Sequence, residues 1–248
     1  MRPDEYAAMY RVEDSHWWYV DMRHVADALL RQRLSDRGED LRILDAGCGT
    51  GGNSAYLRAY GAVTGIDMAA EALCYARKRS GLALARASVE RLPFRDDAFD
   101  LVVSNDVLCH LAVADDRRAA GELARVLRPG GILYVQLPAF EGLRSHHDVA
   151  VHTVHRYTKR EVGRLLTSAG LQARRVTYAN ALLFPAAAAW RFARKRDKPE
   201  DIERSDVHPV PAPLNTALRT ALSLEALLIR VRDLPFGLSV IGIGEKSA

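Results

Sequence analysis

A regular alternation of strand-like and helix-like segments from residue 41 onward most constrains how this chain can fold. Apolar runs bounded by turn signals predict strands at residues 41–45, 62–67, 82–87, 99–104, 132–137 and 171–178. Helical periodicity predicts helices between them at residues 53–60, 69–79, 115–127 and 158–170. Such alternation requires right-handed crossovers, so we expect a mostly parallel sheet covered by helices on both faces.

The segments on either side of this alternation predict further helices. Residues 15–34 carry apolar side chains every three or four positions, which is typical of one amphipathic helix. Helical stretches at residues 182–196 and 214–232, joined by a proline-marked connector, separate the sixth strand from a last strand-like run at residues 238–243. A long insertion in a compact α/β unit is more often a functional lid than an idle loop.

The composition fits one packed globule and excludes several classes of protein. Hydrophobic residues make up 48%, with 17 Gly and 10 Pro in 248 residues, which excludes a disordered or collagen-like chain. The longest apolar run, residues 181–190, is about half the length that crosses a bilayer. The first residues lack the basic and apolar stretches of a secretory signal, so we expect a cytoplasmic protein.

Charge and cysteine content add two further expectations. The net charge of +4 is too small to indicate a nucleic-acid partner. The densest basic cluster is interpreted as the solvated end of a helix, and it consists of Arg191, Arg194, Lys195 and Arg196. The three cysteines are too far apart for a zinc or disulfide pattern, which predicts reduced thiols at Cys48, Cys74 and Cys109.

A glycine-rich loop joins the first predicted strand to the helix after it. Its sequence, Gly-Cys-Gly-Thr-Gly-Gly at residues 47–52, lets a ligand approach the backbone closely. Asp67 lies 20 residues after Gly47 at the end of the second strand, where a carboxylate can accept both ribose hydroxyls. The loop predicts a nucleoside ligand at the carboxyl edge of these strands; the alternative is a tight turn with an accidental acid.

Four segments in order favour one kind of nucleoside. They are Leu-Asp-Ala-Gly-Cys-Gly-Thr-Gly at 44–51, Gly-Ile-Asp-Met at 65–68, Leu-Pro-Phe at 92–94 before Phe-Asp-Leu-Val at 99–102, and Leu-Arg-Pro-Gly-Gly at 127–131. With these segments the chain resembles the class I S-adenosylmethionine-dependent methyltransferases, in particular the type 11 group that acts mostly on small molecules. The resemblance covers about residues 40 to 140.

The resemblance implies contacts to the methionine end of S-adenosylmethionine. Asp45 and the loop residues Gly47, Cys48 and Gly49 would face the aminocarboxypropyl group, whose ammonium needs an acceptor and whose carboxylate needs donors. The segment 16–19 with Arg23 also resembles an N-terminal segment that folds over the cofactor in these enzymes. Tyr19 would then cover the sulfonium and Arg23 would bind the carboxylate; the alternative is that this helix only packs on the sheet.

The resemblance also implies contacts to the nucleoside end. Asp67 would hold the ribose and Met68 would lie on an adenine face. Ser88 and Val89 stand where the family places an acid and a small residue beside the adenine amine, so serine is a departure that predicts a weaker contact. Asn105, just beyond the fourth strand, would lie beneath the sulfonium.

Several residues are candidates for work on the acceptor. His110 is five residues beyond Asn105 and is predicted to remove a proton, with a structural role as the alternative. His155 and Tyr157 belong to a His-Arg-Tyr segment that recurs in relatives, so both are catalytic candidates. The histidines of residues 146–155 are irregularly spaced, and no metal is expected. Glu225 is either a paired core acid or a carboxylate in the acceptor pocket.

Together these observations predict a Rossmann-like, seven-stranded α/β methyltransferase fold whose last strand is antiparallel. We expect a cofactor-covering helix at residues 1–38, a core at 39–180, a helical lid at 181–236 and a returning strand at 237–248. The predicted reaction moves a methyl group from S-adenosylmethionine to an oxygen, nitrogen or carbon of a small, partly apolar molecule. A dinucleotide-dependent oxidoreductase and a non-catalytic nucleotide- or RNA-binding module are the alternatives. Contact with a membrane surface stays open.

Overall fold

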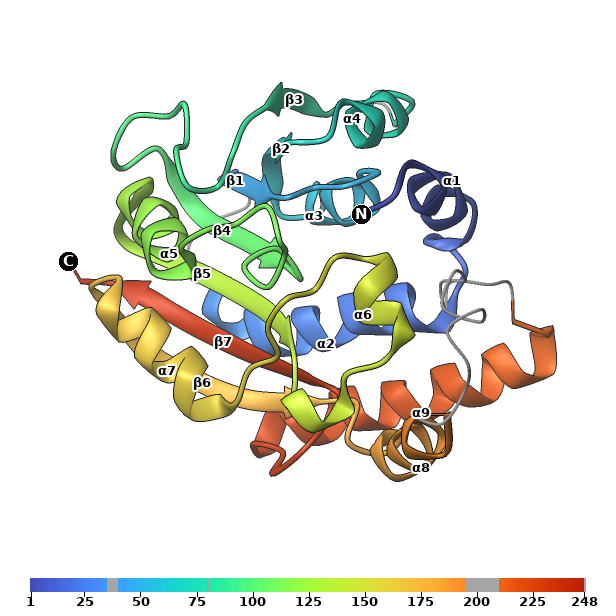
Figure 1. The fold of residues 1–248 in the computed structure, drawn as a ribbon. Helices are drawn as coiled ribbons and strands as arrows, with labels where there is room; N and C mark the ends of the chain where they lie inside the picture. The colour runs from blue at the N-terminus through green and yellow to red at the C-terminus, as the bar shows by residue number, and fades with distance from the viewer. Residues whose placement is uncertain (35–39, 80, 195–209, 248) are drawn as a thin grey trace.

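The computed structural model describes residues 1–34, 40–79, 81–194 and 210–247. Seven strands form one sheet in the order β3-β2-β1-β4-β5-β7-β6 (Figure 1). Their bounds are β1 Leu41–Ala46, β2 Gly61–Asp67, β3 Ala83–Arg86, β4 Phe99–Asn105, β5 Leu127–Pro138, β6 Leu171–Ala179 and β7 Ser239–Lys246. Strand β7 runs antiparallel to both β5 and β6, and the pairs among β1 to β5 are parallel. The predicted fold class is confirmed.

Helices cover both faces of this sheet. Their bounds are α1 Pro3–Val12, α2 Trp17–Leu34, α3 Gly52–Leu57, α4 Ala70–Ala76, α5 Asp116–Arg125, α6 His146–Ala150, α7 Lys159–Ser168, α8 Phe184–Arg194 and α9 Ala212–Val231, with a 3-10 turn η2 at Glu141–Leu143. Helix α7 packs on β6 and β7, α5 packs on β5, and α9 lies along α2. Among the described residues, no helix is long and apolar enough to cross a membrane.

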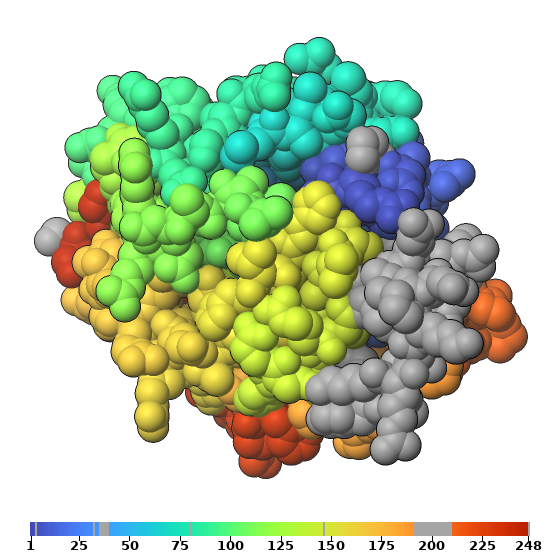
Figure 2. Space-filling view, in the orientation of Figure 1, coloured from blue at the N-terminus to red at the C-terminus, as the bar shows by residue number. Residues whose placement is uncertain are grey.

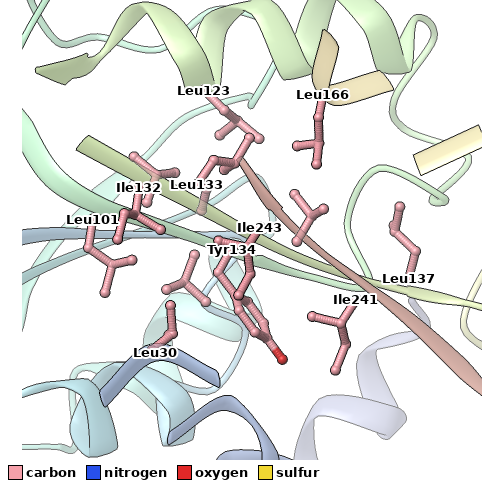
Figure 3. Close-up of a cluster of buried hydrophobic side chains, with 14 of the residues drawn as sticks. Leu30, Leu101, Leu123, Ile132, Leu133, Tyr134, Leu137, Leu166, Ile241 and Ile243 are labelled. Carbon is pink, nitrogen blue, oxygen red and sulfur yellow. The ribbon is translucent and has the colours of Figure 1, made fainter. Parts of the chain in front are cut away.

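The core lies on both sides of the central strands because successive strand residues point to opposite faces. In Figure 3, Leu133 points toward Leu123 of α5, whereas its neighbour Tyr134 points to the other side of the sheet, where Leu30 of α2 lies. All four side chains are almost fully buried. This two-sided burial explains the nearly unbroken apolar runs of the strands, and it places the polar residues of the site at the strand ends.

Two elements differ from the sequence prediction. The segment expected to form one cofactor-covering helix at residues 1–38 contains two helices, and α1 was not predicted as a separate element. Pro3 stands at its first turn with Asp4 and Glu5 beside it, a pattern that favours a helix start. Strand β5 begins at Leu127, where a turn into the strand was expected. Leu127 pairs with Phe99, and the next pair along the strands is Ile132 with Leu101. The register therefore shifts between these pairs, and residues 128–131 form an irregular part of the strand.

Helix α9 is attached to α2 by polar contacts as well as by packing. Asp21 of α2 is fully buried and accepts a hydrogen bond from the Ser223 hydroxyl at 3.2 Å, with Arg219 at 3.6 Å. Asn215 accepts from the backbone N–H of Trp17 at 2.9 Å. The expected domain boundaries, including the lid at 181–236, stay a prediction. Residues 195–209 of that segment, and the side chains of the basic cluster, lie outside what the structure describes.

Candidate functional site

The glycine loop lies at the carboxyl edge of the sheet between β1 and α3. The backbone N–H groups of Gly47 and Cys48 both donate to the carbonyl of Ile66 at 2.8 Å, which ties the loop to β2. Gly47 has φ +88°, and a Cβ there would overlap the side chain of Val107. The loop therefore tolerates only glycine at this position, and its backbone stays open to a ligand.

Asp67 joins the loop to the end of β2. Its Oδ2 accepts from the backbone N–H of Gly49 at 2.9 Å, and its Oδ1 accepts from Ala69 at 2.8 Å. Burial raises the pKa of Asp67, and these two backbone bonds oppose the rise. Because each carboxylate oxygen keeps a free lone pair, Asp67 can accept a pair of hydroxyl groups from a ligand.

Asp45 is the most deeply buried acid of the loop region. It is 1% exposed and accepts from the hydroxyl of Ser54 at 2.5 Å. Burial raises the pKa of Asp45 to about 6, and the negative charges of Asp67 and Glu13 act in the same direction. A cation beside such a carboxylate would stabilise its ionised form. Cys48 beside it is buried, and burial strongly raises the pKa of its thiol, so it is an unreactive thiol.

Arg23 reaches the loop from α2. Its Nε donates to Asn53 Oδ1 at 3.1 Å, while its Nη2 is buried and makes no hydrogen bond. A Cβ at Gly52 would lie 2.6 Å from this Nη2. An unsatisfied guanidinium nitrogen in contact with the loop is suited to bind a carboxylate of a ligand.

Glu13, at the end of α1, also contacts the loop, and the sequence analysis did not predict this. It is 4% exposed and accepts from the Thr50 hydroxyl at 2.5 Å and from Arg79 at 2.7 Å. Met9 of the same helix lies against Gly49. Helix α1 therefore covers the loop, and in Figure 2 it fills the space between the α4 region and the segment around α6. The helix-start pattern at Pro3 was the sequence signal that could have revealed it.

The residues predicted to hold adenine lie near the ends of β2 and β3. Met68 is 44% exposed beside Asp67, and Val89 is buried. The hydroxyl of Ser88 accepts from the backbone N–H of Glu90 at 3.2 Å. The backbone N–H of Ala87 donates to the Asp67 carbonyl at 3.1 Å, so this segment lies beside the end of β2. Their contacts to adenine stay a prediction.

The end of β4 presents two polar residues. The Oδ1 of Asn105 is buried without a hydrogen-bond partner. Asp106 has a positive φ of 55°, and its Oδ2 accepts from Gln136 Nε2 at 3.2 Å. Its side chain is accessible, yet the surrounding protein desolvates the carboxyl and raises the pKa of Asp106 to about 6. The sequence analysis did not single out this acid.

Tyr19 of α2 lies between the glycine loop and the polar residues at the end of β4. Burial raises the pKa of its hydroxyl well above the usual range, and the charges of Glu13 and Asp106 add to this effect. The ring of His16 packs edge-on against it at 5.9 Å between centroids. The structure thus brings together the loop, Asp67, Arg23 and Tyr19, which come from β1, β2 and α2.

His110 lies in the segment after β4. Its ring centroid is 5.6 Å from that of His152, and its Nε2 is 2.8 Å from the amino nitrogen of Met1. Burial lowers the pKa of His110 to about 4. The imidazole is therefore neutral at physiological pH and accepts a proton only weakly, so its role as a base stays a prediction.

His155 and Tyr157 are held by other contacts. His155 is flanked by Glu141 at 3.2 Å and by Glu161 at 3.6 Å. The buried Tyr157 hydroxyl donates to Asp116 at 2.8 Å. Among the described residues, no hydrogen bond joins these two side chains to the glycine loop, and no cluster suited to a metal ion is found. Their catalytic roles stay a prediction.

Glu225 of α9 is a paired core acid. It is fully buried, and its carboxylate accepts hydrogen bonds from the backbone N–H groups of Asn180, Ala181 and Leu182. All three donors belong to the segment after β6. Glu225 therefore fixes the connection from β6 to α8, and the alternative of a free carboxylate in the acceptor pocket finds no support in these bonds.

The sheet order, the glycine loop and the acid at the end of β2 are typical of an α/β protein with a nucleoside site at the carboxyl edge of its strands. Residues 44–135 match the family model of a methyltransferase domain. The chain is 41% identical over 113 residues to malonyl-[acyl-carrier protein] O-methyltransferase of Enterobacter lignolyticus, covering 45% of this chain and 43% of that protein. It is 34% identical over 134 residues to the probable tRNA methyltransferase 9B of Homo sapiens, covering 53% and 29%.

A solved structure agrees over the whole chain. The putative methyltransferase in complex with the Trm112 activator of Haloferax volcanii matches with a TM-score of 0.61 and 24% identity, over 99% of this chain and 96% of that one. The chain spans less than half the length of the two curated relatives named above. Residues 44–135 thus carry a methyltransferase domain, and the relatives of the chain are class I S-adenosylmethionine-dependent methyltransferases, whose methyl donor is S-adenosylmethionine. The expected family and cofactor are confirmed.

Proposed function

We propose that this protein transfers the methyl group of S-adenosylmethionine to an oxygen, nitrogen or carbon atom of a small, partly apolar acceptor. The carrying observation is the order of three polar groups along the loop. Arg23 has a buried N–H without a hydrogen-bond partner, Asp45 is a buried carboxyl whose ionised form a cation stabilises, and Asp67 can accept a diol. They correspond to the carboxylate, the ammonium and the ribose of the cofactor, so the residues present fit it.

The same groups argue against a dinucleotide. A pyrophosphate at this loop would lie beside the carboxylates of Asp45 and Glu13, both of which are buried within the loop region. Like charges in a desolvated site repel strongly. The acids that suit an ammonium therefore oppose a phosphate, which supports the sulfonium cofactor.

When bound, the cofactor supplies an activated methyl group: the acceptor atom bonds to the methyl carbon while the carbon–sulfur bond breaks and its electron pair stays on sulfur. The chain's own work is to align the acceptor and exclude water. Tyr19 and Asn105 flank the expected position of the sulfonium. Asp106 is placed to take the proton that an O–H or N–H acceptor loses, because its pKa of about 6 leaves it ionised at neutral pH.

An apolar acceptor is supported by aromatic rings near the end of β5. The ring of Phe140, two residues beyond the strand, stacks on Tyr178 at 4.8 Å and meets Phe184 of α8 at 6.0 Å. Phe184 in turn lies 5.3 Å from Phe236. Apolar and aromatic linings with few polar groups are typical of small-molecule sites.

The test has two parts. Calorimetry with S-adenosylmethionine, S-adenosylhomocysteine and NADH should give binding of the first two only. Incubation with methyl-labelled cofactor and separated acyl thioester, lipid and RNA fractions should then label the acceptor class. Capture of NADH without affinity for either sulfur compound would contradict the proposal, and label confined to RNA would contradict the small, apolar acceptor.

A further inference from the structure

We propose that the outward face of α9, together with the exposed apolar residues of α8 and the segment before β7, is a docking surface for an anionic lipid bilayer. The purpose of this docking, which is access to an apolar acceptor, rests on the proposed methyltransferase function. The binding itself is argued from the surface.

The outward face of α9 forms an uninterrupted uncharged row. The positions 213, 217, 220, 224, 227 and 231 follow one another at spacings of three and four, so they lie on one side of the helix, and each is exposed. Leu224 is 54% exposed, Leu227 is 56% exposed and Val231 is 81% exposed. We call these three residues and Leu228, which is 43% exposed, the apolar ridge.

The polar groups along this face are already satisfied within the helix. The hydroxyl of Thr216 donates to the carbonyl of Ala212 at 2.9 Å, and that of Thr220 donates to the carbonyl of Thr216 at 3.0 Å. Both threonines are exposed, so they offer methyl groups rather than unsatisfied donors. A face without unsatisfied polar groups can enter the lipid interface without losing hydrogen bonds.

The ridge cannot turn inward. The opposite side of α9 holds Glu225, which accepts the three backbone bonds described above, and Ser223 is bonded to the buried Asp21 of α2. The helix is thus fixed in rotation. An exposed apolar face that is fixed outward marks an interaction surface rather than a loosely packed core helix.

Neighbouring segments extend the surface. Trp190 of α8 is 60% exposed, Leu182 is 48% exposed and Phe236 is 42% exposed. Phe236 contacts Phe184 of α8, which places the end of α9 and α8 on one surface. Tryptophan and phenylalanine beside leucines are the residues that bury at the headgroup boundary.

The charges beside the ridge select an anionic surface. Arg230 and Arg232 carry positive charge at the end of α9, while Arg219 lies 3.6 Å from the buried Asp21. The exposed acid beside them, Asp233, is paired with Arg175 at 2.7 Å. A second copy of this chain seated on the ridge would bring its own arginines against these, because a two-fold contact repeats the same patch. Anionic headgroups instead complement the arginines while the ridge enters the acyl boundary.

The same surface leads toward the site. The rings of Phe236, Phe184 and Phe140 follow one another, with centroids 5.3 Å and 6.0 Å apart. Phe140 stands just beyond β5, whose Gln136 is bonded to Asp106. An acceptor with a hydrocarbon tail can therefore keep that tail along these rings while its polar end lies near Asp106.

The experiment is co-sedimentation of the full chain with two kinds of vesicle: phosphatidylcholine alone, and phosphatidylcholine mixed with phosphatidylglycerol. We expect binding to the mixed vesicles and much weaker binding to the neutral ones. Leu224→Glu with Leu227→Glu should reduce binding by more than about tenfold, because apolar burial is lost and negative charge is added. Arg230→Gln with Arg232→Gln should reduce it by about fivefold for each arginine.

Matched variants on the other side of the molecule serve as controls. Arg117→Gln with Arg118→Gln removes the same charge from exposed positions of α5, and Leu111→Glu changes a leucine that is 65% exposed; both should bind as the unmodified chain does. An unchanged Kd for S-adenosylmethionine in calorimetry shows that each variant is folded. It also separates a failure of the docking proposal from a failure of the proposed function.

Three results would overturn the proposal. In the first, the unmodified chain stays in the supernatant with both vesicles. In the second, the ridge variant binds vesicles as before. In the third, the unmodified chain is a dimer without lipid and the ridge variant is a monomer in gel filtration, which would assign the ridge to a second copy.

Discussion

The free N–H of Arg23 allows a sharp test of how the methionine end of the cofactor is held. In Arg23→Gln the side chain loses its charge and withdraws from the loop at Gly52. A charge-assisted hydrogen bond from a buried donor contributes about 2–3 kcal/mol, so the Kd for S-adenosylmethionine should rise roughly 30- to 150-fold. Isothermal titration calorimetry measures this directly.

A cofactor analogue separates a direct contact from a structural effect. S-adenosylmethionine without its carboxylate should bind the unmodified chain more weakly by a similar factor, since the Nη2 of Arg23 then has no acceptor in the ligand. In Arg23→Gln the two compounds should bind almost equally, because the group that distinguishes them is gone. Arg31→Gln is the matched control: Arg31 lies on the same helix, is 72% exposed and pairs with Asp27. A full preference for the carboxylate in Arg23→Gln would refute the reasoning.

Three further outcomes are expected. Asp67→Ala should weaken cofactor binding by about 2–4 kcal/mol, because two ligand hydroxyls lose their acceptor. An unchanged Kd in calorimetry would contradict the assigned ribose contact. Because the pKa of Asp45 is raised to about 6, its carboxyl is protonated below that pH, so the affinity for the cofactor ammonium should fall there and binding near pH 6 should release a proton. An affinity that is constant from pH 5 to 8, or a fall that persists in Asp45→Asn, would contradict this. Asp106→Asn should slow transfer to an O–H or N–H acceptor by about 100-fold and abolish the rise in rate through about pH 6, leaving the cofactor Kd unchanged; full activity would exclude Asp106 as proton acceptor.

The sequence allowed the sheet and the loop to be predicted because their signals are local. Alternating apolar runs located all seven strands, and the capping box of Thr158 and Glu161 marked the start of α7. The antiparallel last strand came from resemblance to the family. The bulged start of β5 could not be predicted, since it depends on pairing between Leu127 and Phe99 across the sheet.

Parts of the site depend on contacts that no local pattern carries. Glu13 gains its place only because α1 folds back over Thr50, far along the chain. Asp106 follows the expected Asn105 directly, but its desolvation and its bond to Gln136 arise from the neighbouring strand. Conversely, Glu225 stood out as a lone acid among leucines, and only the backbone donors after β6 explain it.

Helix α2 serves two regions at once. Asp21 faces α9, and Arg23, two residues later and so on the opposite side of the helix, faces the glycine loop. Helix α2 thus contacts both α9 and the glycine loop, so a shift of this helix changes its contacts with both. Binding affinities that are coupled through one element change by the same factor in both directions. If bound cofactor changes the affinity of α9 for a surface, that surface therefore changes the affinity of the loop for the cofactor by the same factor.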